Sequence, residues 1–165
     1  MMSLVTSIKG LVLLGCCLGQ AVAAPLYITL SGTLIVTPPE CTVNSGSTTD
    51  INFGEVHETL IDNVSYKRTA INYGLTCTNV YSNALRMTLS WSNVVIGGMN
   101  AVKTNRTNFG LAIFQNTTRL NNNAVINFTN GSTPALYAVP VKPAGTVLTD
   151  GGSFTGTLNM LVEYQ

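Results

Sequence analysis

The sequence has few charged residues, since Asp, Glu, Lys and Arg make up only 9 % of its 165 positions. The formal net charge of +1 excludes the broad basic surface that nucleic-acid binding requires, and it excludes a polybasic membrane-surface segment. Hydrophobic residues make up 45 %, so the low charge does not indicate disorder. The space left by charge is filled by Asn, Thr, Ser and Gly, which favour strands and turns in a chain of one-domain length.

Histidine is almost absent, because His57 is the only one in the chain. It stands between Glu55 and Glu58, in a predicted loop that follows Phe53-Gly54. No nucleophile elbow, paired catalytic carboxylates, zinc motif or phosphate-binding glycine loop accompanies it. We therefore interpret His57 as a solvated loop residue, and we expect no enzymatic activity, no small-molecule substrate and no cofactor or metal.

Long hydrophobic runs are missing as well, and none approaches the roughly 20 residues of a membrane-spanning helix. The apolar run at residues 10–18 is short, follows Lys9 and precedes Ala21-Val22-Ala23. This order predicts a secretory signal peptide over residues 1–23. An alternative is that Leu13-Leu14-Gly15-Cys16 serves as a weak lipoprotein cleavage box, which would attach a lipid to Cys16.

Cysteine is scarce, and removal of the signal peptide would take Cys16 and Cys17 with it. Cys41 and Cys77 then remain, and an even number of cysteines in an exported chain favours a disulfide. Closing a loop of about 36 residues is worth roughly 4 kcal/mol in the chain-entropy model. A metal site is the alternative, but a single imidazole in the whole chain makes it the weaker one.

What the chain does have is alternation of apolar and polar residues with a period of two. Residues 26–36 alternate cleanly, which predicts a half-buried strand, and Pro38-Pro39 would end it. The apolar register of this segment contains Leu26, Ile28, Leu30, Gly32, Leu34 and Val36. Further strands are predicted over residues 49–53, 66–77, 84–91, 109–115, 124–128, 136–141 and 153–164. Short strands separated by turn-rich pieces predict an all-β sandwich.

The last segment, residues 153–164, alternates in the same way as the first. Its apolar register contains Phe154, Gly156, Leu158, Met160, Val162 and Tyr164. The predicted mature chain therefore begins and ends with a long amphipathic strand. The plainest interpretation is that both strands pair inside their own sheet.

Trp91 and the Asn-rich loops raise the alternative of carbohydrate binding, because aromatic faces and amide side chains suit sugars. A self-contained secreted β-sandwich of this kind would be an adhesin-like or lectin-like monomer, stable without a partner. Trp91, however, closes the alternating run of Leu85, Met87 and Leu89, and this position favours the core.

The two ends resemble a known family. Gly152, followed by alternating apolar residues and the penultimate Tyr164, resembles the C-terminal motif of fimbrial (pilin) subunits of the bacterial chaperone–usher pathway. Residues 26–36, with Gly32 in the apolar register, resemble that family's N-terminal donor extension. Three further stretches resemble the pilin domain: Pro38-Pro39-Glu40-Cys41 with Phe53-Gly54, Cys77, and Tyr137-Ala138-Val139-Pro140-Val141. The N-terminal stretches look closest to minor tip subunits such as the P-pilus tip adapter.

The resemblance implies an incomplete immunoglobulin-like Greek-key sandwich that lacks its last strand. It divides the chain into a signal peptide (1–23), a donor-strand extension (24–40) and a pilin domain (41–165). The implied partners are a periplasmic chaperone, an outer-membrane usher and neighbouring fimbrial subunits, which include the tip adhesin as a candidate. The implied location is an extracellular fimbrium on the cell surface, reached through the periplasm, where the subunit supports adhesion. Tip adapter, tip-fibrillum subunit and rod subunit share all of these features.

The resemblance also implies roles for single residues. The donor face would be Ile28, Leu30, Gly32, Leu34 and Val36, with Gly32 allowing close approach to a bulky part of a neighbour's groove. The chaperone-recognition and acceptor-groove strand would carry Gly152, Phe154, Gly156, Leu158, Met160, Val162 and Tyr164. The alternatives are a simple β-bulge at Gly32 and ordinary packing of Tyr164 at the rim of the sheet.

Overall fold

The structure is a computed structural model that describes residues 27–165. The predicted signal peptide, its lipidation alternative at Cys16, and Leu26 lie outside the described residues. The chain divides into two compact units, one that ends at Ile35 and one that comprises Val36–Gln165. Within the described part, no helix combines the length and the apolar character needed to cross a membrane.

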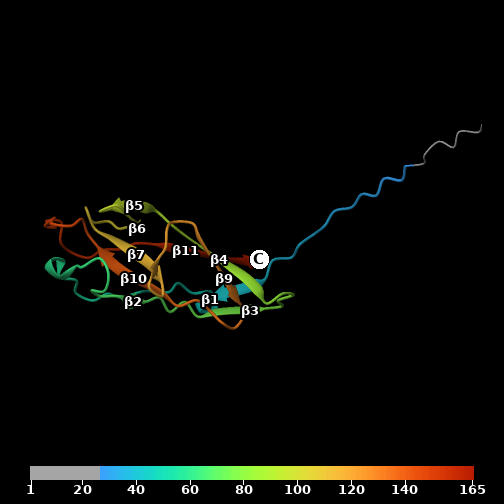
Figure 1. Ribbon diagram of the computed structural model, residues 1–165. Coiled ribbons are helices and arrows are strands. Elements are labelled where there is room, and N and C mark those ends of the chain that lie inside the picture. Colours follow the sequence, from blue (N-terminus) through green and yellow to red (C-terminus); the bar gives the residue numbers. More distant parts are fainter. Residues whose placement is uncertain (1–26) are drawn as a thin grey trace, which may run out of the picture. The chain divides into compact units, whose positions relative to one another are not determined.

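The unit Val36–Gln165 consists of strands and two short 3-10 helices (Figure 1). The predicted all-β class is therefore confirmed. In chain order the elements are β1 (Glu40–Val43), η1 (Asn44–Gly46), η2 (Glu58–Leu60), β2 (Thr69–Ala70), β3 (Leu75–Thr78), β4 (Ala84–Trp91), β5 (Asn93–Ile96), β6 (Met99–Lys103), β7 (Gly110–Gln115), β8 (Thr118–Arg119), β9 (Ala124–Thr129), β10 (Leu136–Val141) and β11 (Leu158–Tyr164).

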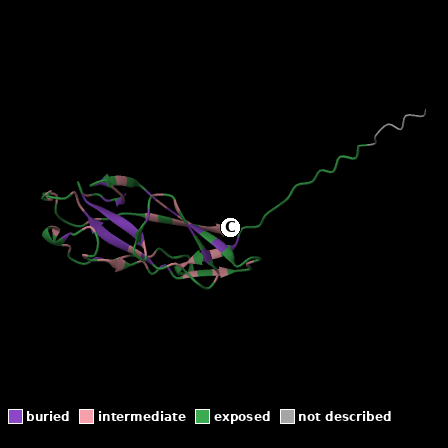
Figure 2. Cartoon of the chain, viewed as in Figure 1, coloured by how far each residue is buried: buried purple, intermediate pink, exposed green. Residues whose placement is uncertain are grey.

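Among residues 27–165 the strands form three sheets. The largest has the order β2-β10-β7-β6-β5, with β8 attached to β7, and the second has the order β11-β4-β9. A small pair, β1 and β3, carries the cysteines. The main core contains alternate residues of β4, β7, β9 and β10, which face one another across the sandwich (Figure 2).

Several predicted strands match the structure closely. The strands β4 and β10 have the predicted bounds, and β7 and β9 differ from the predictions by one residue each. The strands β5 and β6, which the sequence analysis did not predict, form a hairpin around Gly97 and Gly98, both with positive φ. Their Asn residues and irregular alternation hide the period of two that a single half-buried strand shows.

The other predicted strands are corrected by the structure. Residues 49–53 form no strand, and residues 66–77 are split into β2 and β3, because the chain changes from one sheet to another between them. Gly74, with φ of +47°, stands at this change of partner, where a left-handed backbone favours glycine. The last strand starts at Leu158 and not at Ser153.

Candidate functional site

The strand β11 lies at the edge of its sheet. Among the described residues it pairs with β4 and with no other strand, so its second edge carries no β-ladder. In register, Met160 lies opposite Leu89 and Val162 lies opposite Met87. Leu89 and Met87 are completely buried, whereas their neighbours on β11 are only half-buried. The inward side chains of β4 are therefore fully covered, whereas those of β11 remain partly exposed to solvent.

A groove runs along this open side of the core, with a volume of about 570 Å³. One wall is the chain from Phe154 to Met160, and the other is Val43 with the segments 47–51 and 71–73. Its lining includes six residues of the buried core, namely Phe53, Tyr73, Val102, Leu111, Ile113 and Ala138. Core side chains thus reach the groove, as they would where a covering strand is missing.

Thr49 stands on the wall opposite β11. Its Oγ1 is buried, yet it has no hydrogen-bond partner within the described residues. Buried polar atoms are paired in the great majority of cases. The groove therefore has an unmet polar group on a wall that also carries Ser47, Thr48 and Asp50.

The groove continues into a second hollow of about 780 Å³. The two share Asp50, Ile51, Phe53 and Phe154 in their linings. The three aromatic rings at this junction pack together, with centroids of Phe154 lying 5.8 Å from Phe53 and 4.8 Å from Phe109. We call this second hollow the groove mouth. It is also lined by Glu58, Arg106 and Asp150, so it is more polar than the groove.

Arg106, in the loop between β6 and β7, holds the chain just before β11. Its Nε and Nη2 donate to the carbonyl of Ser153 at 2.8 and 2.6 Å, and its Nη1 donates to Asp150 Oδ1 at 2.9 Å. The neighbouring Asn105 Oδ1 accepts from the N–H of Thr155 at 2.9 Å. We call these contacts the arginine clasp. They hold residues 153–155 by side chains, which explains why the β-ladder begins only at Leu158.

The arginine clasp places a strict demand on Gly152. Its φ is +110°, and a Cβ built on it would lie 2.8 Å from Arg106 Nη2. The backbone conformation disfavours a side chain at this position, and the guanidinium would have to shift to admit one. The glycine of the predicted C-terminal motif thus has a role inside the chain itself.

The arginine clasp also perturbs Asp150. The N–H of Thr107 donates to its Oδ2 at 3.1 Å. This hydrogen bond first, and the Arg106 guanidinium second, lower the pKa of the Asp150 carboxyl below its ordinary value. Both partners favour the ionised carboxylate, so the arginine clasp forms when Asp150 is charged.

Gly156 makes a second close approach. A Cβ there would lie 3.1 Å from Val102 Cγ1 and 3.3 Å from the carbonyl oxygen of Lys103. The chain before β11 therefore passes close against β6 without forming a ladder with it. Of the remaining predicted groove residues, Phe154, Leu158 and Met160 line the groove.

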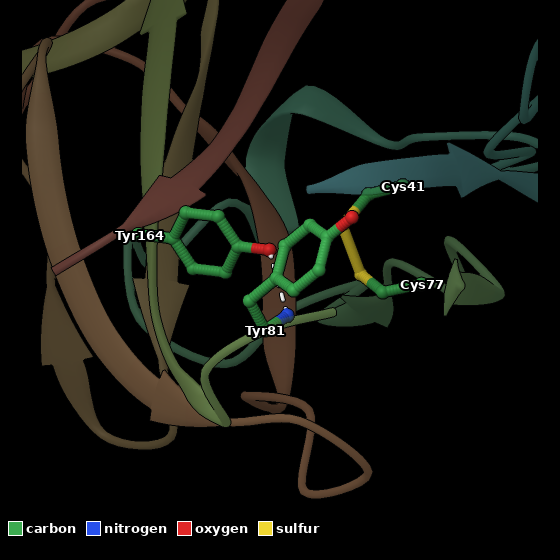
Figure 3. Close-up of a disulfide and its surroundings, with 4 residues drawn as sticks. All are labelled: Cys41, Cys77, Tyr81 and Tyr164. Atoms are coloured by element: carbon green, nitrogen blue, oxygen red, sulfur yellow. Dashed lines mark hydrogen bonds between the residues drawn. A yellow bond between two sulfur atoms is a disulfide. The ribbon is translucent and has the colours of Figure 1, made fainter. Parts of the chain in front are cut away.

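At its other end β11 is tied to the loop that follows β3. The hydroxyl of Tyr164 accepts a hydrogen bond from the backbone N–H of Tyr81 at 3.0 Å (Figure 3). The predicted disulfide is present, and Cys41 and Cys77 are register partners of β1 and β3. Tyr164 therefore packs at the rim of the sheet and fixes the end of the open strand.

The side chains of the predicted donor face are exposed to solvent. Ile28, Leu30, Leu34 and Val36 are 69–90 % exposed, and Gly32 has no atom within 4 Å of a Cβ built on it. None of the described residues of this segment belongs to a strand, because an extended segment forms a β-ladder only with a partner. The predicted strand is thus unpaired among residues 27–165.

Two further predictions concern Trp91 and His57. Trp91 is a core residue as predicted, 5 % exposed, and its Nε1 donates to Asn93 Oδ1 at 3.2 Å. Its ring is not available to a sugar, which removes the feature that suggested a lectin. His57 is an exposed residue of the loop that leads into η2, as predicted.

Comparison with known proteins agrees with this geometry. Residues 28–165 match the family described as fimbrial protein. The chain is 32 % identical over 136 residues to the fimbrial-like protein YfcR of Escherichia coli K12, which covers 80 % of this chain and 77 % of the relative. It is 27 % identical to the minor fimbrial protein PrsF of Escherichia coli, over 87 % of this chain and 90 % of the relative.

The fold agrees as well. A structure of the P pilus adaptor subunit PapF superposes with a TM-score of 0.56 at 24 % identity, over 78 % of this chain and 98 % of the other. An open-edged β-sandwich is the fold that this chain shares with pilus subunits. The chain belongs to the fimbrial protein family, and the predicted resemblance to minor tip subunits of the chaperone–usher type is confirmed. It is a structural subunit of a cell-surface fimbrium.

The arginine clasp is the part of the site that the sequence analysis missed. Asp150-Gly151-Gly152 has the composition of a turn, and nothing local marks Arg106 as the partner of Asp150. The two residues are 44 positions apart, and a single sequence has no signal for such a pairing.

Proposed function

We propose that this subunit is joined to its neighbours by strand exchange, with the groove along β11 as the acceptor and residues 26–36 as the donor. The observation that supports this is the half-buried face of Leu158, Met160 and Val162 above a floor of core side chains. A strand added to the free edge of β11 would gain main-chain hydrogen bonds and bury alternate side chains. Four aliphatic donor residues, at about 1.5–3 kcal/mol each, would supply about 6–12 kcal/mol before ordering costs.

On this proposal the functional domains are an extension over residues 24–40 and a pilin domain over residues 41–165. A periplasmic chaperone would cover the groove during export, since an uncovered apolar edge invites aggregation. At the outer-membrane usher, the extension of the next subunit would replace it. The subunit would support adhesion by linking other subunits and would have no catalytic activity of its own.

The test uses the chain from residue 24 onward with a synthetic peptide of residues 26–36. We expect the chain alone to aggregate or to insert into its own copies, and the peptide to keep it monomeric. A matched peptide with Leu30→Ser and Leu34→Ser keeps the length and the main-chain groups but loses apolar contacts, and should fail. A soluble, peptide-independent monomer would contradict the proposal.

A further inference from the structure

The end of the pilin unit that lies away from β1 and β3 carries two loops that brace each other. They lie at the far end of the sandwich in Figure 1. Lys142 Nζ donates to Glu58 Oε2 and to the carbonyl of Thr146, both at 2.7 Å. The N–H of Lys142 donates to Asn63 Oδ1 at 2.8 Å. These bonds connect the loop of residues 57–66 to the loop of residues 142–148, and we call the pair the braced loops.

The first of the braced loops is rigid for a second reason. Asp62 Oδ1 accepts from the N–H groups of Val64, Ser65 and Tyr66 at 2.8 to 2.9 Å. The N–H of His57 donates to the hydroxyl of Tyr66 at 3.0 Å. A loop so fully hydrogen-bonded presents its side chains in one arrangement, which lowers the ordering cost of binding.

This rigid frame presents three large apolar side chains to solvent, beside the polar Thr59, Asp62 and Ser65. Leu60 is 56 % exposed, Val64 is 58 % exposed and Val147 is 71 % exposed. The same loops supply Glu58, Ile61 and Leu148 to the mouth of the groove. The braced loops therefore border the mouth of the acceptor groove.

The donor strand of a neighbour is joined to its own domain by a very short connection. Only Thr37, Pro38 and Pro39 separate Val36 from the start of β1 at Glu40. Four residue steps span at most about 14 Å, and paired prolines are stiff. We call the end of the pilin domain that carries β1, β3 and the Cys41–Cys77 bond its disulfide end. A neighbour whose donor strand fills the groove must therefore hold its disulfide end close to one end of that groove.

A fibre of more than two subunits determines which end of the groove lies beside the neighbour's disulfide end. The end that carries β1 is where a subunit connects to its own extension. If neighbours met there on both sides, the same surface would be needed twice. A continuing fibre therefore places the neighbour's disulfide end at the groove mouth, beside the braced loops.

We propose that the braced loops are a second contact surface of the fibre joint, occupied by the disulfide end of the neighbouring pilin domain whose strand fills the groove. In a second copy of this chain that end displays Tyr81, which is 83 % exposed. An exposed aromatic ring is well suited to pack on Leu60, Val64 and Val147. This inference rests on the proposed strand exchange.

The test compares two donors on the same acceptor chain. One is the peptide of residues 26–36, and the other is a whole second copy whose own groove is already filled with that peptide. We expect the whole copy to leave the acceptor at least about tenfold more slowly than the peptide in a fixed urea concentration. Val64→Ser with Val147→Ser in the acceptor should remove this difference while leaving release of the peptide unchanged.

Two controls accompany the comparison. Val125→Ser changes an equally exposed valine on β9 (59 %) and should preserve the difference. Tyr81→Ser in the donor copy should reduce it. Equal release of peptide and whole copy, or failure of the whole copy to insert where the peptide does, overturns the second contact surface. Failure of the peptide itself to bind overturns the proposed strand exchange first.

Discussion

The Nη2 atom of Arg106 lies 2.8 Å from the point where a side chain on Gly152 would begin. The guanidinium occupies the space into which a side chain on residue 152 would project while it holds the carbonyl of Ser153. Gly152 and Arg106 therefore act as one unit at the entrance of β11. This relationship gives the C-terminal glycine a physical reason that requires no partner protein.

Replacing Gly152 by Ala should destabilise the peptide-filled chain. The positive φ alone costs about 1–3 kcal/mol, and displacement of the Arg106 guanidinium adds to it. In an Arg106→Ala background only the backbone part should remain, so the two changes should be non-additive. Urea unfolding of the four forms measures this coupling.

The control for that experiment is Gly151→Ala. Gly151 has no strongly positive φ and no atom within 4 Å of a built Cβ. It should lie within about 0.5 kcal/mol of the wild type, as exposed sites do. Equal losses at Gly151 and Gly152, or strict additivity with Arg106→Ala, would contradict the role of the arginine clasp.

Gly32→Leu should block donation by this chain and leave its own pilin unit unchanged. Nothing lies within 4 Å of Gly32 in the structure, so a side chain there strains nothing in the subunit itself. In a neighbour's groove, added bulk on the inserted face meets a packed floor, where overpacking typically costs about 1–3 kcal/mol.

The measurement is incorporation of the variant between wild-type subunits in assembled pili, together with its own unfolding midpoint. Ser31→Leu adds the same bulk to the opposite face of the segment and serves as the control. If Gly32→Leu is incorporated as well as Ser31→Leu, Gly32 is not in the inserted register.

Tyr164→Phe should loosen the far end of β11 while keeping the ring in place. It removes the oxygen that accepts from the N–H of Tyr81, and loss of one such bond costs about 0.5–1.5 kcal/mol. Hydrogen exchange at the amide of Tyr81 should become faster. Tyr81→Phe retains the same N–H donor and should leave that exchange rate unchanged, whereas an unaltered rate in Tyr164→Phe would argue against this bond.

Acid should weaken the arginine clasp. The folded pKa of Asp150 lies below the ordinary 3.8, so its carboxylate stabilises the folded chain. That contribution is complete above the unfolded pKa and is lost as the pH falls through the folded pKa. At about pH 6 Asp150→Asn should be less stable than wild type, and the difference should shrink towards about pH 2.5.

Urea midpoints of the peptide-filled chain at the two pH values test this dependence. Glu55→Gln removes a carboxylate that has no hydrogen-bond partner among the described residues, and should match wild type at both. A gap between wild type and Asp150→Asn that widens on acidification would have the wrong sign for this mechanism.

The parts of the fold that were predictable from sequence are those in which one strand face enters the core. In β4, apolar Leu85, Met87 and Leu89 alternate with polar residues, and the predicted bounds were correct. Residues 49–53 show the opposite case, because their apolar residues line the groove without a ladder. Alternation records which side is apolar, and does not record whether a partner strand is present.

The same limit applies to the site. The open strand and its apolar residues could be inferred from periodicity and from the resemblance of residues 152–164 to a family motif. The arginine clasp could not, because Arg106 and Asp150 meet only through the folding of two distant loops. The braced loops are equally hidden, since Lys142 and Glu58 are 84 positions apart.

The apolar core residues in the lining of the groove determine how a joint between subunits would respond to salt and acid. Val102, Leu111, Ile113 and Ala138 carry no ionisable group, and neither do Ile28, Leu30, Leu34 and Val36. Contacts of this kind are not screened by salt and do not titrate. A filament held together by them would keep most of its cohesion across wide changes in ionic strength and acidity. The charged groups near such a joint would be Asp50 of the lining and the Arg106–Asp150 pair of the arginine clasp.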